Sequence, residues 1–539
     1  MDLSISTSDK VRSRIRDLPA YIRVCMVSTL LWGILAHGIA LVTKFSMADE
    51  AHYLFSVGAT VTSGRWLLGV LGAIVRWVFG SPNFSLPLWS GLATLFFTGL
   101  CSCVLVWWLK LSHKWSWSLA SGLLTVFPVM SGLFFYNFTA PYYMFGLLLI
   151  LWGGALLRNR RSAASFALAV CLVCLGLSIY QAFLSLFLSL LLVSFFQTLS
   201  DGESRTFSVL FKEIARYLLG CIVIAALYLL TVKLSIFLVG EGLSDYKGIS
   251  TMGAADLGQY IQRVKLAIYL FLFPARSDRY AFLLPYRLLD CYYVVLTLIA
   301  LWGGWQIIRL FRHSPVQAIT ALLALTFFPL TVNFIYVVCN QEDVYNLMLF
   351  GQLAPFLLLL CLLDRKTSPK KPVFWVQRAS AGLLLVFCLF CARVDNAVYT
   401  RGQLIQTRSI SYFTSLVTAI RSTPGYTGST PVAFVGDPSY AMDPTFHSIE
   451  GFGALSMAPL PYDASPFSIG YSWQDFLTLW CGFTPPYADG EDFADLPEVQ
   501  AMPGYPDNGS VRMVAGTVVV KLNTSKPEPP RHHRKDCSH

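Results

Sequence analysis

Charged residues are scarce in this chain of 539 residues. Only 13% are Asp, Glu, Lys or Arg, whereas 55% are hydrophobic and the mean hydropathy is +0.58. Soluble globular domains carry about 25% charged residues, so this composition excludes the soluble class. The chain is therefore expected to lie in a lipid bilayer.

Acidic residues are almost absent from the long apolar runs. These runs recur along the chain at about 17 to 25 residues, the length of a helix that crosses a hydrocarbon core of about 30 Å. They are continuous rather than alternating, which indicates helices and not strands. Intramembrane acids are typical of pumps and ion-coupled carriers, and internal repeats are typical of many transporters, but neither feature is evident in the sequence. A transporter is therefore the less favoured interpretation.

A disulfide framework is also lacking. Most of the 13 cysteines lie inside apolar runs, where they act as small packing residues. Only Cys291, at the edge of a run, and Cys339, Cys481 and Cys537, outside the runs, are plausible disulfide partners, and no Cys and His spacing resembles a zinc site. Neither a structural metal nor a disulfide scaffold is predicted.

The apolar runs predict about eleven transmembrane helices. Their ranges are 22–43, 86–109, 116–134, 140–157, 163–178, 181–198, 215–239, 290–308, 316–338, 346–363 and 373–391. The fifth and sixth can alternatively form one long kinked helix, because Ser178 to Gln181 leave little room for a loop.

Basic residues cluster on every second connection between these spans. The clusters precede the first span (Lys10, Arg12, Arg14, Arg16) and recur at Lys110 and Lys114, at Arg158 to Arg161, at Arg309 and Arg312, and at Arg365 to Lys371. The positive-inside rule places these connections and the N-terminus in the cytoplasm. We therefore expect a multi-pass protein of the plasma (inner) membrane whose first span acts as a signal anchor.

Topology also accounts for the net charge of +10. From residue 392 onward there are ten Lys and Arg against fourteen Asp and Glu, so this tail carries −4 and the rest of the chain carries +14. The excess positive charge falls mostly in cytoplasmic connections, and nucleic acid is not an expected partner.

The sequence changes character after residue 391. A helix-like stretch leads to about Arg421, and strands are predicted at Pro431 to Val435 and, as a hairpin around Gly516, at Val511 to Leu522. An aromatic-rich segment at 471–483 predicts the core of a small α/β domain, and the alternative is a carbohydrate-stacking or membrane-facing surface. We predict an all-α polytopic membrane domain over 1–391, a small extracytoplasmic α/β domain over 392–525 and a disordered tail over 526–539.

Acidic residues gather in the first outer connection, just beyond the first span. A helix over 47–60 would place Asp49, His52, Tyr53 and Ser56 on one face, with Leu54, Phe55 and Val61 against lipid. A hydroxyl that attacks an anomeric carbon needs a carboxylate to accept its proton, and Asp49 or Glu50 can supply it. The alternative is that both acids only cap and solvate an interfacial helix.

A phosphate leaving group needs nearby cations and hydrogen-bond donors. The outer connections supply Arg65, Arg76, Arg263, Lys265, Arg276 and Arg279. Asn340 and Gln341, in a compact polar outer loop, are candidates for binding acceptor hydroxyls, although a solvated turn has the same composition. Outer aromatic residues such as Trp66 and Tyr143 fit either an interfacial belt or sugar stacking, and the belt is the default interpretation.

The order of these features resembles a known family. A basic N-terminus, one span, an acidic pair and then Ser63-Gly64-Arg65-Trp66 leading into an apolar segment resemble the type II Gtr family of serotype-converting O-antigen glucosyltransferases. Tyr180-Gln181-Ala182 resembles a second family element. The resemblance covers most of residues 20–390 in topology, but its motifs are few and short.

The resemblance implies a glycosyltransferase of the GT-C class, which uses polyprenyl-phosphate sugars and places a catalytic acid in the first outer loop. Carried over by residue, it implies a catalytic role for Asp49 and Glu50. It implies substrate-binding roles for Arg65 and Trp66 and for Tyr180 with Gln181.

The chain departs from a metal-dependent pattern, because the acids are adjacent rather than spaced as Asp-x-Asp. No metal ligand is predicted, although a divalent metal is not excluded. His52 more often serves as a polar interfacial residue than as a base.

The interpretation that follows is transfer of a hexose, most simply glucose, from undecaprenyl phosphate to a surface glycan on the outer face. Membrane lipid, the lipid-linked sugar and the glycan acceptor are the expected partners, with no cofactor beyond the donor. A glycan polymerase or another lipid-linked sugar transferase would share this topology. A glycolipid flippase without chemistry is the alternative from another class.

Overall fold

The computed structural model describes residues 18–46, 49–159, 162–201, 203–244, 255–276, 283–341, 344–364, 372–436 and 473–522. These residues form two compact units. The membrane unit contains the described residues up to 44 and from 53 to 399, and the C-terminal unit contains 45–52 and the described residues from 400 onward.

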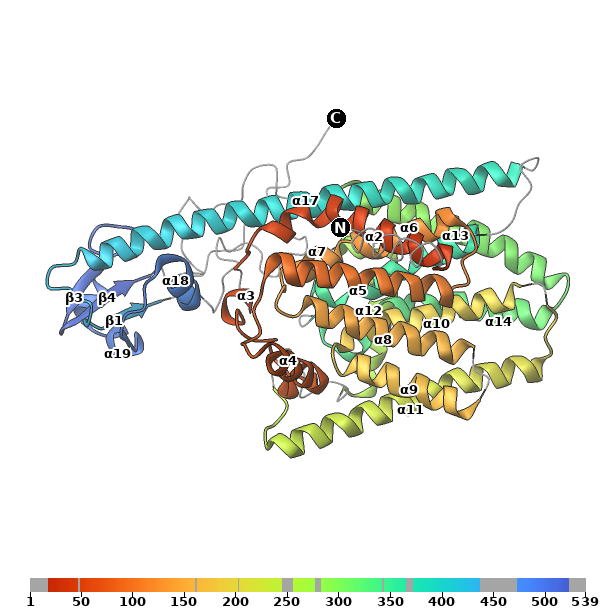
Figure 1. Ribbon diagram of the computed structural model, residues 1–539, viewed down its shortest axis with the longest axis horizontal. Coiled ribbons are helices and arrows are strands. Elements are labelled where there is room, and N and C mark those ends of the chain that lie inside the picture. The colour runs from red at the N-terminus through yellow and green to blue at the C-terminus, as the bar shows by residue number, and fades with distance from the viewer. Residues whose placement is uncertain are drawn as a thin grey trace, which may run out of the picture. The chain divides into compact units, whose positions relative to one another are not determined.

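The membrane unit is helical throughout (Figure 1). Its helices are α2 (Ala20–Val42), α4 (Trp66–Phe79), α5 (Pro87–Trp108), α6 (Lys114–Val126), α7 (Val129–Phe134), α8 (Ala140–Arg158), α9 (Ala163–Leu177), α10 (Leu184–Leu199), α11 (Phe207–Val239), α12 (Leu257–Leu272), α13 (Arg287–Phe311), α14 (Pro315–Val332), α15 (Ile335–Val338), α16 (Ala354–Leu363) and the first part of α17 (Pro372–Arg421). Short 3-10 helices are η1 (Val61–Ser63), η2 (Gln181–Phe183), η4 (Pro274–Arg276), η6 (Asn346–Met348) and η7 (Phe350–Leu353).

Within the described residues, eight helices are long and apolar enough to cross a membrane, and three shorter apolar helices accompany them. Each of the eleven predicted spans contains a helix, so a polytopic helical membrane protein is confirmed. Two helices in connections that were predicted to lie outside, α4 and α12, were not predicted as separate elements.

Two predicted spans differ from the structure in their continuity. The predicted span 116–134 breaks between α6 and α7, where Phe127 is extended (ψ 135°) because Pro128 follows it. The alternative of one helix through 163–198 is wrong, because Tyr180 is extended (φ −155°, ψ 110°) and separates α9 from η2 and α10.

Helices α2, α5, α8 and α9 pack in succession in the membrane unit (Figure 1). Small residues allow α8 and α9 to approach closely: a methyl group at Gly176 would lie 2.5 Å from the carbonyl oxygen of Gly146. Glycine contacts of this kind are a common basis of helix association in membranes. The close crossing places Tyr143 of α8 beside Tyr180, which follows α9.

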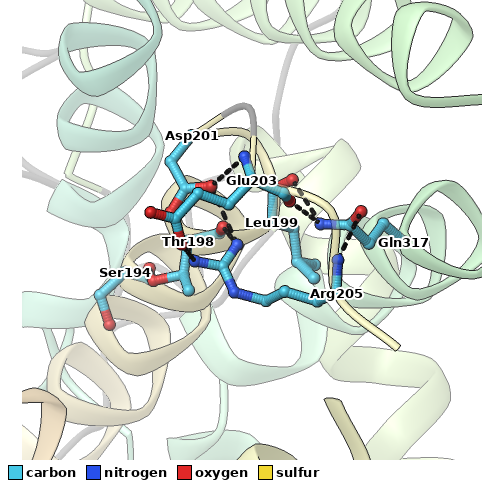
Figure 2. A network of polar contacts seen from close by, with 7 residues as sticks. All are labelled: Ser194, Thr198, Leu199, Asp201, Glu203, Arg205 and Gln317. Atoms are coloured by element: carbon cyan, nitrogen blue, oxygen red, sulfur yellow. Dashed lines mark hydrogen bonds and ion pairs between the residues drawn. The ribbon is translucent and has the colours of Figure 1, made fainter. Parts of the chain in front are cut away.

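A polar network fixes the connection between α10 and α11 (Figure 2). Arg205 donates hydrogen bonds to both carboxylate oxygens of Asp201 at 2.9 and 2.6 Å and to Glu203 at 3.0 Å, and also bonds the carbonyl of Thr198. Gln317 of α14 donates to the carbonyl of Glu203 at 2.8 Å and accepts from the Arg205 N–H at 3.3 Å. The network therefore joins this connection to the start of α14.

The C-terminal unit contains a small mixed sheet. Its elements are the second part of α17, α3 (Asp49–His52), β1 (Val432–Val435), α18 (Trp473–Cys481), β2 (Tyr487–Ala488), α19 (Glu491–Ala494), α20 (Pro497–Gln500), β3 (Val511–Val514) and β4 (Thr517–Lys521). The strand order is β2-β1-β4-β3, with β1 parallel to both neighbours and β3 antiparallel to β4. Both predicted strand regions are confirmed, and a turn at Ala515 and Gly516 closes the hairpin.

The core of this unit explains the aromatic-rich segment. Phe476 and Phe483 are buried against Phe413 of α17 and against β4 residues such as Val518. Of the two interpretations of 471–483, the domain core is therefore correct for these two residues. Tyr471 lies outside the described residues.

The boundary between the units differs from the predicted one at residue 391. Helix α17 runs without a break from Pro372 to Arg421, and the division falls after Tyr399. The second difference is that residues 45–52, which follow the first span, are part of the C-terminal unit. The predicted tail over 526–539 lies outside the described residues.

Candidate active site

The segment Ser63-Gly64-Arg65-Trp66 forms a tight turn between η1 and α4. Gly64 adopts a left-handed conformation (φ 69°), which an L side chain rarely tolerates. The Arg65 N–H bonds back to the carbonyl of Thr60 at 2.9 Å. The turn therefore sets where the Arg65 side chain leaves the backbone.

Gln181 holds this turn in place from the far end of α9. Its amide donates to the carbonyl of Ser63 at 2.7 Å and to the hydroxyl of Tyr228 at 2.9 Å. The Tyr228 hydroxyl in turn donates to the carbonyl of Gly64 at 3.2 Å. The two short motifs singled out in the sequence, more than 100 residues apart, are thus joined by direct hydrogen bonds.

Arg65 lies against tyrosine side chains. It donates a hydrogen bond to the hydroxyl of Tyr143 at 2.9 Å, and its guanidinium carbon lies 5.2 Å from the ring centre of Tyr180. The rings of Tyr143 and Tyr180 are stacked, with centres 4.1 Å apart and an interplanar angle of 14°. Tyr228 and Tyr345 also lie near the guanidinium. This arrangement gives a cation held by π faces and phenol oxygens.

The positive charge of Arg65 has no carboxylate at ion-pair distance among the described residues. Its Nε is buried and has no hydrogen-bond partner in the described part of the chain, and the same is true of the indole Nε1 of Trp66. Buried donors of this kind are costly when they stay unpaired. Two adjacent residues therefore present free donors beside an uncompensated cation, a combination suited to an anion.

The acidic pair has a different setting from the one predicted. In place of a helix over 47–60, α3 spans only Asp49–His52, and a turn and irregular chain follow it. The shared face of Asp49, His52, Tyr53 and Ser56 is therefore not formed, because four residues make a single turn. Met47 and Ala48 lie outside the described residues.

Helix α3 packs on α18 within the C-terminal unit. His52 forms an ion-pair contact from its Nδ1 to Asp475 at 2.9 Å. Glu50 is fully buried, whereas Asp49 is only half-buried. Of the two adjacent acids, Asp49 is therefore the one that is accessible to solvent.

The remaining predicted site residues have separate environments. Tyr53 belongs to the membrane unit and packs on Phe138, with ring centres 5.3 Å apart. Asn340 accepts a hydrogen bond from Arg263, and the Gln341 carbonyl accepts one from Val344. The side chain of Arg276 and the whole of Arg279 lie outside the described residues.

Sequence reasoning assigned Tyr143 to an interfacial belt by default. The structure buries it to 4% exposure and bonds it to Arg65, so the belt interpretation is wrong for this residue. Tyr228 and Tyr345 were not singled out at all. Tyr228 lies within a long apolar run, where the sequence alone does not separate a site tyrosine from an interfacial one.

A second buried polar cluster was also missed. His37 of α2 bonds the hydroxyl of Tyr399 at 2.7 Å and the carbonyl of Thr125 at 2.8 Å. Asp395, one turn before Tyr399 on α17, is fully buried, and neither of its carboxylate oxygens has a hydrogen-bond partner in the structure. Asp395 was expected in the extracytoplasmic tail, but the continuous α17 places it within the membrane unit.

In the described part of the chain, no group of three or more His, Cys, Asp or Glu side chains is placed to hold a metal ion. The Arg65 guanidinium and the unpaired donors of Arg65 and Trp66 are instead suited to an anion.

The family model of Glucosyl transferase GtrII matches residues 38–356 of the chain. The chain belongs to the GtrII glucosyl transferase family. The match includes α3 and every residue of the Arg65 site, and it ends before α17 and the sheet of the C-terminal unit. No curated protein and no solved structure matches the chain. Membership makes this GtrII chain a membrane glucosyltransferase.

Proposed function

We propose that this GtrII protein transfers a glucosyl unit from a polyprenyl-phosphate donor to a surface glycan on the extracytoplasmic face of the membrane. The observation that carries the proposal is the Arg65 site. A guanidinium without a carboxylate partner and two free donors, Arg65 Nε and Trp66 Nε1, lie among the apolar helices of the membrane unit. A phosphate on a lipid chain is an anion that reaches such a position from the bilayer.

In the proposed reaction, a hydroxyl of the acceptor glycan attacks the anomeric carbon of the donor. A new glycosidic C–O bond forms as the C–O bond to the phosphate breaks, and polyprenyl phosphate leaves with the bonding electrons. Arg65 stabilises the negative charge that develops on the phosphate. This electrostatic stabilisation is strongest where water is excluded. For the proton acceptor we propose Asp49, because the family resemblance implies a catalytic acid in this connection and Asp49 is the member of the acidic pair that is not fully buried.

The tyrosines have a positioning role in this proposal. The guanidinium of Arg65 is fixed in position by its hydrogen bond to Tyr143 and by the ring face of Tyr180. Gln181 holds the backbone turn that carries Arg65. A guanidinium fixed in this way does not reorganise when the phosphate charge develops, which is the physical requirement for electrostatic catalysis.

The test uses the purified full chain in liposomes with a polyprenyl-phosphate glucose and an acceptor glycan. Arg65→Ala should lower the turnover by about 10²- to 10³-fold, the usual cost of a lost charge-stabilising group. Arg65→Lys should recover only part of it, because an ammonium lacks the planar fork that pairs with phosphate. Arg76→Ala is the matched control, since Arg76 lies exposed on α4.

Wild-type turnover by Arg65→Ala would refute the assignment of the phosphate to this site. Turnover with a nucleotide sugar alone would refute the lipid-linked donor. A flippase without chemistry would produce no glucosylated acceptor in any variant.

A further inference from the structure

A cavity of about 660 Å³ lies where five helices of the membrane unit begin or end. It is lined by Tyr21 at the start of α2, Trp107 near the end of α5, Lys110, Trp117 near the start of α6, Asn159 after α8 and Ser165 in the first turn of α9. These elements carry the basic clusters that the positive-inside rule assigns to the cytoplasmic leaflet. The cavity is therefore separate from the Arg65 site, and no part of the proposed reaction uses it.

Lys110 is held at the cavity by a strained turn. Its N–H bonds the carbonyl of Trp107 at 3.2 Å, and the next N–H, of Leu111, bonds the carbonyl of Val106 at 3.1 Å. This pair of bonds is the Schellman motif, whose left-handed position is usually glycine. Here Lys110 occupies it at φ 52°. Non-glycine residues that are held in a strained backbone conformation cluster at functional sites.

The charge of Lys110 is not compensated locally. Neither Lys110 nor Arg158 forms an ion pair with a carboxylate of the described residues. Arg158 instead donates to the carbonyl of Trp108 at 2.6 Å and to Gln197 at 2.9 Å. The nearby carboxylate of Asp201 is taken up by Arg205, as Figure 2 shows. Burial, followed by the charge of Arg158, lowers the pKa of Lys110.

Aromatic side chains give the cavity an interfacial character. The indole N–H of Trp117 bonds the carbonyl of Leu111 at 2.8 Å, and its ring meets Tyr21 edge-on at 6.3 Å. Trp107 remains 42% exposed. Trp and Tyr prefer the headgroup level of a bilayer. The cavity therefore combines aromatic side chains typical of that level with the Lys110 ammonium, which has no carboxylate partner among the described residues.

We propose that this cavity binds the phosphate-bearing headgroup of an anionic membrane phospholipid. Lys110 pairs with the phosphodiester, the amide of Asn159 donates a hydrogen bond to it, and Trp107 and Trp117 contact the upper acyl chain. Basic pockets between transmembrane helices on the cytoplasmic side are known to recognise such headgroups. The α9 helix, which begins at the cavity, adds the positive end of its dipole.

The test measures lipid retention by the purified full chain, using native mass spectrometry after reconstitution in phosphatidylglycerol or phosphatidylcholine. Wild-type protein should retain phosphatidylglycerol in preference. Lys110→Gly should lower that preference by about fivefold, the effect of one Lys near an anionic headgroup. It should also raise the unfolding temperature in detergent, since glycine suits the left-handed position. Loss of lipid is thereby separated from loss of fold.

Lys114→Gln is the matched control, because Lys114 is exposed like Lys110 and close to it in the chain but does not line the cavity. It should keep the wild-type preference. The proposal is overturned if Lys110→Gly retains phosphatidylglycerol as the wild type does, or if both variants lose it equally. Displacement of the lipid by an equal concentration of inorganic phosphate would overturn it as well, because the site would then select a free anion.

Discussion

The turn that carries Arg65 depends on a glycine, and replacing it tests the architecture of the site. A Cβ at Gly64 would lie 2.8 Å from the Tyr228 hydroxyl and 2.9 Å from the Gln181 amide nitrogen. Gly80, at the other end of α4, has a similar backbone conformation (φ 61°) but no atom within 4 Å of its Cβ position. An alanine at either position therefore incurs the same cost of a left-handed backbone conformation, but only at Gly64 does it also clash with neighbouring side chains.

The expected magnitudes follow from this difference. A left-handed alanine costs roughly 1 to 2 kcal/mol at either position. At Gly64 the methyl group also displaces Gln181 and Tyr228, which removes the bonds to the carbonyls of Ser63 and Gly64. At about 1 kcal/mol for each net hydrogen bond, Gly64→Ala should be less stable than Gly80→Ala by about 2 kcal/mol.

The assay compares denaturant unfolding of both variants in the same lipid mixture, together with glucosyl transfer at a temperature where both remain folded. Gly64→Ala should lose most of its activity while folded, because Arg65 is no longer positioned, and Gly80→Ala should keep it. Equal stability and equal activity of the two variants would show that the Gln181 and Tyr228 contacts do not hold the turn.

Three further predictions concern other polar groups. Asp49→Asn should leave stability near wild type and reduce turnover by about 10²-fold or more. Glu50→Gln changes a fully buried position and should lower the melting temperature. Wild-type turnover of both variants would reject a catalytic acid at this pair. Burial alone would raise the pKa of Asp201, but hydrogen bonds from Arg205 and from the N–H of Glu203, together with the charge of Arg205, lower the pKa below its usual value. The ionised Asp201 therefore stabilises the folded protein above about pH 4, and this contribution is lost as the pH falls through the pKa of Asp201 in the folded state. Asp201→Asn should therefore reduce the fall in the free energy of unfolding at acid pH. An unchanged fall would contradict the pairing of Asp201 with Arg205. Tyr399→Phe removes the 2.7 Å bond to His37 inside the membrane unit and should cost about 1 to 3 kcal/mol in denaturant unfolding; a neutral effect would mean that His37 finds another partner.

The sequence by itself determined the class of the protein and most of its helices. Continuous apolar runs leave the backbone no partner but itself in lipid, so length and hydropathy suffice to place spans such as α2, α5 and α8. The alternation and turn residues around Gly516 were likewise sufficient for the hairpin of β3 and β4, because a strand pair closed by a short turn is a local structure. The motifs at Ser63 to Trp66 and at Tyr180 with Gln181 were visible for the same reason, as short local patterns.

Only the tertiary structure decided how these patterns meet. The hydrogen bond from Gln181 to Ser63 joins positions more than 100 residues apart, and nothing in either local pattern specifies the partner. The burial of Tyr143 beside Arg65 and of Asp395 beside Tyr399 depends on which faces of α8 and α17 turn inward, which helix packing sets and an apolar run does not encode. The short α3 was mispredicted as a long amphipathic helix because its neighbour α18 comes from a segment more than 400 residues later. Local chemistry therefore determines which elements form, and long-range packing determines which side chains become a site.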